Sequence, residues 1–155
     1  MDRYEPPDAF LKSLIDDEAP LTGAEGESNC RRLMMLMRDE DPANRDWATL
    51  LLAQQGMDTD EVRQALLAAA EDENEYVRAE AILGLAQRDK ALALPLLRRE
   101  LGGECVAVPL LEAAALVADP SLVPDLRDFT VPSDNSPLDE LAAEALSACE
   151  RAARP

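Results

Sequence analysis

Three glutamates recur at a fixed interval, and their carboxylates are the side chains whose spacing could support chemistry. Glu80, Glu112 and Glu144 follow one another every 32 residues, and each stands directly before an alanine. Carboxylates pair strongly with lysine or arginine, and two carboxyls about 5–10 Å apart can also act as a general acid and base. The chain contains no histidine, and it carries no glycine-rich phosphate loop or nucleophile motif. The pattern favours binding over catalysis, so we expect no catalytic, metal-binding or cofactor-binding residue.

The alanines that follow these glutamates define how the helices must be oriented. Equivalent alanines occur at Ala48, Ala81, Ala113 and Ala145. If each alanine faces the core, the residue before it turns about 100° away, toward the edge of the exposed face. The predicted partner-binding ridge consists of Trp47, Glu80, Glu112, Glu144, Gln54 and Gln87. The alternative is an ordinary solvated surface, in which Trp47 covers a gap beneath an N-terminal arm.

Longer sequence similarity around these residues predicts stacked helical hairpins. Residues 77–85 align with 141–149, and residues 44–52 fit the same frame one interval earlier. A period of 32–33 residues with helix-forming content is typical of helical repeat arrays. We find no apolar–polar alternation of the length that a strand requires. The predicted fold class is therefore all-α.

Helix start and stop signals divide the chain. We predict an acidic N-terminal arm over 1–28, with a helix at 8–17 and a loop at 19–29, followed by a repeat array over 29–155. The four predicted repeats cover 29–57, 58–88, 89–118 and 119–151. Asp41 before Pro42 is a helix-opening signal, and Asn74 is a further predicted cap. Asp58 with Glu61 resembles a capping box.

One repeat carries the residues of a known pattern. Asp72, Val77, Arg78, Ala81 and Leu85 resemble HEAT-like repeats, particularly the short kind first noticed in phycobilisome lyases. Asp39, Arg45, Ala48 and Leu52 repeat most of this pattern, whereas Leu110 and Ala142 replace the arginine in the last two repeats. The resemblance implies a right-handed α-solenoid of about four hairpins, with an N-terminal capping helix and the second helices on the concave face. It also implies that the arginine and aspartate tie neighbouring repeats together.

The net charge of the chain restricts the classes of molecule that we expect it to bind. The net charge is −17, from 32 acidic and 15 basic residues. Nucleic acids and anionic membranes bind basic surfaces, so we expect neither as a partner. A basic protein is the complementary partner. The basic clusters at Arg31–Arg32 and around residues 88–99 are predicted to be solvated helix surface.

Cysteine and methionine usage completes the sequence evidence. Cys30, Cys105 and Cys149 are widely spaced and form no CxxC pair, which favours core thiols in a reducing compartment. We find no signal peptide at the N-terminus, and we expect a cytoplasmic protein. Most of residues 34–37, three of them methionines, are predicted to be core, although methionines also form adaptable binding surfaces.

We therefore predict a non-catalytic protein-interaction module or scaffold whose acidic concave face binds a basic protein. The most concrete version is an immunity-type inhibitor that covers the active site of a basic toxin such as a nuclease. Two alternatives remain open. The family resemblance suggests a bilin-lyase-like enzyme, and an open solenoid end suggests an assembly subunit or homodimer. The residues for end stacking are Leu138, Leu141, Leu146 and Cys149. A role like that of HEAT-like DNA glycosylases is disfavoured, because the predicted groove is acidic.

Overall fold

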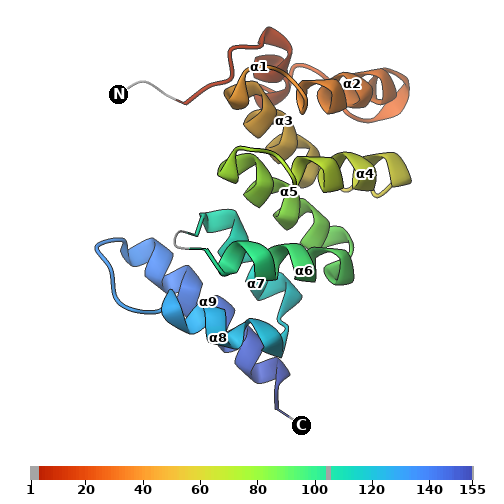
Figure 1. Cartoon of the computed structure of the whole chain (residues 1–155). Helices are drawn as coiled ribbons and strands as arrows, with labels where there is room; N and C mark the ends of the chain where they lie inside the picture. Colours follow the sequence, from red (N-terminus) through yellow and green to blue (C-terminus); the bar gives the residue numbers. More distant parts are fainter. Residues whose placement is uncertain (1–3, 104–105, 155) are drawn as a thin grey trace. The chain divides into compact units, whose positions relative to one another are not determined.

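The computed structural model describes residues 4–103 and 106–154, and every regular element in these ranges is helical (Figure 1). The elements are α1 (Ala9–Ile15), α2 (Gly23–Leu36), α3 (Pro42–Gln54), α4 (Asp60–Ala69), α5 (Glu75–Arg88), α6 (Lys90–Leu101), α7 (Val108–Val117), a 3₁₀ turn η1 (Pro120–Leu122), α8 (Val123–Asp128) and α9 (Ser136–Ala152). They fall into an N-terminal unit, Met1–Ala81, and a C-terminal unit, Ile82–Pro155. The predicted all-α class is confirmed.

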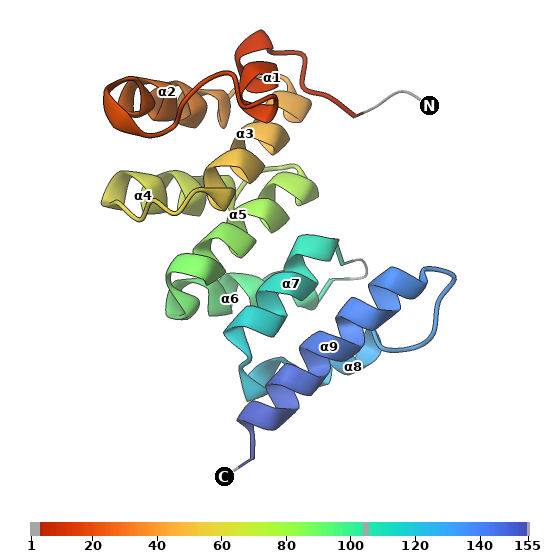
Figure 2. The same cartoon turned by 180° about the vertical axis from the view of Figure 1, so that it is seen from behind.

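The N-terminal unit is organised around α3. Helices α1, α2 and α4 each pack against α3, and both views show α2 and α4 on the same side of it (Figures 1 and 2). The fully buried leucines of this unit are Leu11, Leu33, Leu52 and Leu66. Each helix contributes one apolar stripe to this core, as expected for amphipathic helices.

The C-terminal unit is built around the pair α7 and α9. These helices lie side by side in Figure 2, and α6 packs on α7 while α8 packs on α9. Ala142, Ala145 and Cys149 form the buried stripe of α9. Small side chains allow the backbones of two helices to approach closely, and the Cys149 thiol lies 3.7 Å from the carbonyl oxygen of Ala114.

The predicted helix orientation is correct in all four repeats. The alanines used to align the repeats have 0% exposure, and they are Ala48, Ala81, Ala113 and Ala145. Cys30 and Cys149 are buried as predicted, whereas Cys105 and Glu104 lie outside the described residues. The residue before each alanine is therefore turned off the core, as the ridge hypothesis requires.

The predicted loop at 19–29 is wrong, because α2 already begins at Gly23. Glycines at positions 23 and 26 suggested a loop, but Gly26 is buried inside the helix. A Cβ atom at Gly26 would lie 2.4 Å from the carbonyl carbon of Leu21. This glycine is thus needed for close packing of the helix on the preceding segment, and α2 extends into the range assigned to the N-terminal arm.

Most predicted caps are confirmed, and one is wrong. The Asp41 carboxylate accepts a hydrogen bond from the Ala43 amide at 2.8 Å, and the Asn74 side chain accepts one from the Tyr76 amide at 2.9 Å. The cap of α4 is Thr59, whose hydroxyl accepts from the Val62 amide. Asp58 does not cap this helix.

The carboxylate of Asp58 is engaged elsewhere. It receives two hydrogen bonds from the Arg63 guanidinium, at 2.6 and 2.8 Å. The predicted capping box fails because a bidentate arginine is a stronger partner for a carboxylate than a backbone amide.

The arginine–aspartate tie implied by the resemblance is present between the first two repeats. Arg45 on α3 donates from Nε and Nη2 to the two carboxylate oxygens of Asp72, at 2.9 and 3.2 Å. Both side chains are only 11% exposed. The Nη1 atom of Arg45 also donates to the carbonyls of Asp39 and Glu40. Arg78 makes the equivalent contacts in the next repeat, to the carbonyls of Asp72 and Glu73.

This geometry predicts that Arg45→Lys destabilises the protein although the charge is retained. One ammonium group cannot replace a planar fork that contacts a carboxylate and two carbonyls together. We expect the free energy of unfolding to fall by about 1–2 kcal/mol, measured by urea denaturation. Arg31→Lys is the matched control, because the Arg31–Glu27 pair is exposed and such pairs contribute about 0–1 kcal/mol. Equal effects of the two substitutions would contradict the prediction.

Candidate partner-binding site

Three of the predicted site residues line one groove in the C-terminal unit. Gln87 comes from the last turn of α5, Glu112 from α7 and Glu144 from α9. The other residues lining this cavity of about 420 Å³ are Leu83, Leu111, Ala115, Leu116 and Leu141. We call this set the acidic groove. The close contact of α7 with α9 brings Glu112 and Glu144 to it.

The chemistry of the acidic groove is that of a cation-binding surface with an apolar base. Glu112 and Glu144 are exposed, while Leu141 and Ala115 of the same lining are partly buried. No lysine or arginine occurs among the described residues that line it. An arginine or lysine side chain suits this arrangement, because its methylene stem packs on apolar atoms while its charged head stays at the surface.

Trp47 occupies a different environment from the other predicted site residues. It lies on α3 in the N-terminal unit, where the Tyr4 ring stacks on it with centroids 5.8 Å apart. Both rings line a small cavity of about 60 Å³ beside α1. The indole Nε1 is buried and has no hydrogen-bond partner among the described residues. The structure thus places Trp47 beneath the N-terminal segment. This position agrees with the alternative prediction, in which Trp47 covers a gap under the N-terminal arm. Its role in partner binding remains a prediction.

The contact between the N-terminal segment and α3 is partly polar. The Tyr4 hydroxyl donates a hydrogen bond to Asp46 Oδ2 at 3.0 Å. Burial and this hydrogen bond raise the pKa of Tyr4 to about 12. Burial also raises the pKa of Asp46, although the bond from Tyr4 opposes that shift. Protonated Tyr4 therefore holds the segment on α3 across the physiological pH range.

The remaining predicted site residues also belong to the N-terminal unit. Gln54 is the exposed last residue of α3, and Glu80 is partly buried on α5. The small cavity beside Trp47 includes neither of them in its described lining. Glu80 therefore differs from Glu112 and Glu144, which are both exposed and share one groove.

The structure also locates the residues of the alternative predictions. Of the four apolar residues considered for end stacking, Cys149 is fully buried, and Leu138, Leu141 and Leu146 are partly buried. In the basic cluster of α2, Arg31 pairs with Glu27, and the Arg32 guanidinium lies 4.3 Å from the centroid of the Phe10 ring.

Two further findings concern metals and membranes. Within residues 4–103 and 106–154, no group of three histidine, cysteine, aspartate or glutamate side chains is placed to hold a metal ion. None of the helices in the described ranges combines the length and the apolar character needed to cross a membrane.

The stacking of Tyr4 on Trp47 yields a testable prediction. Trp47 is the only tryptophan, so fluorescence excited selectively at the indole comes from this residue. We expect Tyr4→Ala to shift the emission maximum to longer wavelength and to increase quenching by acrylamide, because the indole becomes solvated. Tyr76→Ala, which removes another exposed tyrosine, is the control and should leave the spectrum unchanged. An unchanged spectrum in Tyr4→Ala would refute the contact.

Comparison with known proteins agrees with this architecture. Residues 31–108 match the HEAT repeats family. The chain is 29% identical over 138 residues to Protein YibA of Escherichia coli K12 and to that of strain O157:H7, covering 89% of this chain and 46% of each relative. An X-ray structure of E. coli YibA superimposes with a TM-score of 0.63 at 23% identity, covering 92% of this chain and 54% of that one.

The chain therefore spans about half the length of the curated relatives it matches. The structural likeness shows the fold, and it confirms the predicted α-solenoid class. The family match is to HEAT repeats in general, and it covers the Arg45–Asp72 tie and the acidic-groove residue Gln87. The chain is a helical repeat protein that is related to YibA and belongs to the HEAT-repeat family.

Proposed function

We propose that this protein is a non-catalytic protein-interaction module whose acidic groove binds a basic protein partner. The observation that carries the proposal is that exposed Glu112 and Glu144 line one groove together with aliphatic side chains and with no basic residue in the described lining. Repeat proteins use extended surfaces of this kind for binding. The partner would place a lysine or arginine between the two carboxylates, with its stem on Leu116 and Leu141.

The charge of the whole chain supports this reading. A net charge of −17 accelerates encounter with a basic protein and makes the association rate sensitive to salt. The same charge opposes binding to nucleic acids and to anionic membranes. The buried free thiols of Cys30 and Cys149 support a reducing compartment such as the cytoplasm.

The specific role we propose is that of an immunity-type inhibitor. A basic toxin, for example a nuclease, needs a cationic surface to hold its own anionic substrate. A strongly acidic protein that covers this surface blocks the substrate by competing for the same cations. Inhibition then requires no catalytic group of its own, in accord with the lack of histidine in the sequence.

The experiment is an affinity capture from lysate of the source organism at low and high salt. Three baits are compared: the wild type, Glu112→Lys/Glu144→Lys, and the control Asp128→Lys/Asp134→Lys. The control makes the same change in net charge at exposed residues outside the groove. We expect a basic protein to be captured by the wild type and the control, to be released by salt, and to be missed by the groove variant.

Affinity for the captured protein provides the quantitative check. Reversal of two glutamates that pair with partner cations should weaken binding at least tenfold, which corresponds to about 1.4 kcal/mol. The control pair should change the dissociation constant much less. Equal binding by both variants would show that net charge alone drives association and would contradict a site at the acidic groove.

A further inference from the structure

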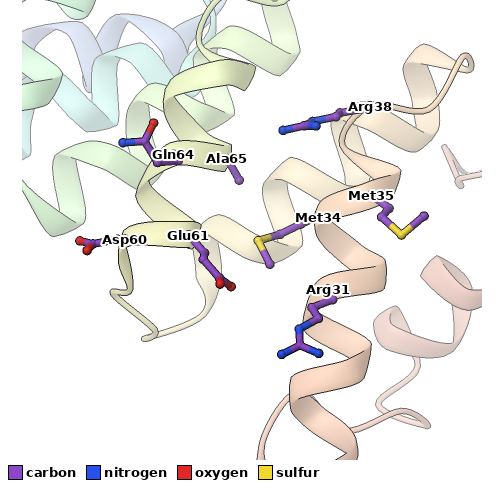
Figure 3. A pocket seen from close by; sticks show the side chains of 8 residues that line it. All are labelled: Arg31, Met34, Met35, Arg38, Asp60, Glu61, Gln64 and Ala65. Atoms are coloured by element: carbon purple, nitrogen blue, oxygen red, sulfur yellow. The ribbon is translucent and has the colours of Figure 1, made fainter.

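A second and larger groove lies in the N-terminal unit, between α2 and α4 (Figure 3). Its volume is about 750 Å³, which lies within the range of about 300–1,000 Å³ seen for ligand pockets. The residues that line it are Arg31, Met34, Met35, Arg38, Asp60, Glu61, Gln64 and Ala65. We call it the α2–α4 groove. The sequence interpretation did not identify it, and it shares no residue with the acidic groove.

The α2 wall of this groove is cationic. Arg31 lies in the last two turns of α2, and Arg38 follows in the turn just after this helix ends at Leu36. Both project toward α4 in Figure 3. Arg31 pairs with Glu27 at the surface, while exposed Arg38 makes no ion pair within the described part of the chain. An arginine with no ion pair to the described residues is notable in a chain with 32 acidic and 15 basic residues.

The α4 wall is anionic. Asp60 and Glu61 are exposed in the first turn of α4, and the Glu61 side chain extends toward α2 in Figure 3. Arg63, two residues further on, pairs with Asp58 and is not among the residues that line the groove. The two walls of the α2–α4 groove therefore carry opposite charges.

Between the walls the groove is apolar and adaptable. Met34 points from α2 toward α4, and the methyl group of Ala65 faces it from the other side (Figure 3). Met35, also in the lining, is 74% exposed. Methionine side chains are flexible and polarisable, and they adjust to the apolar side chains of a partner. Only Met37 of these neighbouring methionines is buried in the core.

We propose that the α2–α4 groove binds an amphipathic helix of a protein partner. That helix carries an apolar stripe for Met34 and Ala65, an acidic edge for Arg31 and Arg38, and a basic edge for Glu61. A helix laid along α2 places one acidic residue beside Arg31 and another, further along, beside Arg38 in the turn that follows α2. A segment with only basic edges is repelled by the arginine wall, and one with only acidic edges is repelled by α4.

Three synthetic helical peptides test this proposal. All three carry the same leucine stripe. The mixed-edge peptide has glutamates along one edge of the stripe and lysines along the other edge. The two uniform peptides have lysines along both edges or glutamates along both edges. Binding is measured by fluorescence anisotropy with the wild type, with Arg31→Glu/Arg38→Glu, and with the control Lys90→Glu/Arg154→Glu. The control reverses two exposed basic residues outside the groove.

We expect the wild type and the control to bind the mixed-edge peptide about tenfold more tightly than either uniform peptide, since two exposed pairs together contribute about that much. Arg31→Glu/Arg38→Glu should prefer the lysine-edged peptide instead. A second variant, Met34→Ala, leaves the charge unchanged and should weaken binding of the mixed-edge peptide about fivefold. Circular dichroism checks that each variant folds.

Several results would overturn the proposal. Preference of the wild type for the lysine-edged peptide would show that net charge alone governs binding. Failure of all three peptides to bind, or equal binding of the mixed-edge peptide by the wild type and Met34→Ala, would exclude a helix in the groove. A concentration-dependent dimer that is lost in Arg31→Glu/Arg38→Glu would assign the groove to a second copy of this chain.

Discussion

The interaction on which the N-terminal repeats depend is the buried fork between Arg45 and Asp72. It joins α3 to the turn that precedes α5, and both side chains are withdrawn from solvent. Breaking such a pair costs more than its net contribution, because the remaining charge would be buried without a partner. The same guanidinium holds the carbonyls of the preceding turn. One side chain thus fixes both the start of its own helix and the position of the next repeat.

Much of this fold follows from the repeat pattern of the sequence. The interval of 32–33 residues placed four alanines at equivalent positions, and all four are buried. Asp41 and Asn74 cap their helices as predicted, since a short polar side chain directly before a helix can accept from the unpaired amides of its first turn. Gly26 misled the interpretation because its role is a close backbone contact with Leu21, which no local pattern reveals. Helix identity was thus predictable, and contacts between distant segments were less so.

For the candidate site, too, features within a repeat were predictable from the sequence, and contacts between distant segments were not. The frame that put Glu112 and Glu144 off the core also put Gln87 on the same ridge, and these three residues share one groove. The position of Trp47 under Tyr4 depends on where a segment 43 residues away folds back. The sequence therefore left two alternatives for Trp47, an exposed anchor or a residue covered by the N-terminal arm. The α2–α4 groove was missed because its charges become meaningful only when two helices from different repeats face each other.

The central functional claim is that a basic partner binds at the acidic groove, and hydrogen–deuterium exchange of the complex with the captured partner tests it most directly. The account predicts slower exchange of amides in α7 and α9, which carry Glu112 and Glu144, than in the free protein. Protection confined to α1–α4, or no change in α7 and α9 at a saturating partner concentration, would contradict it.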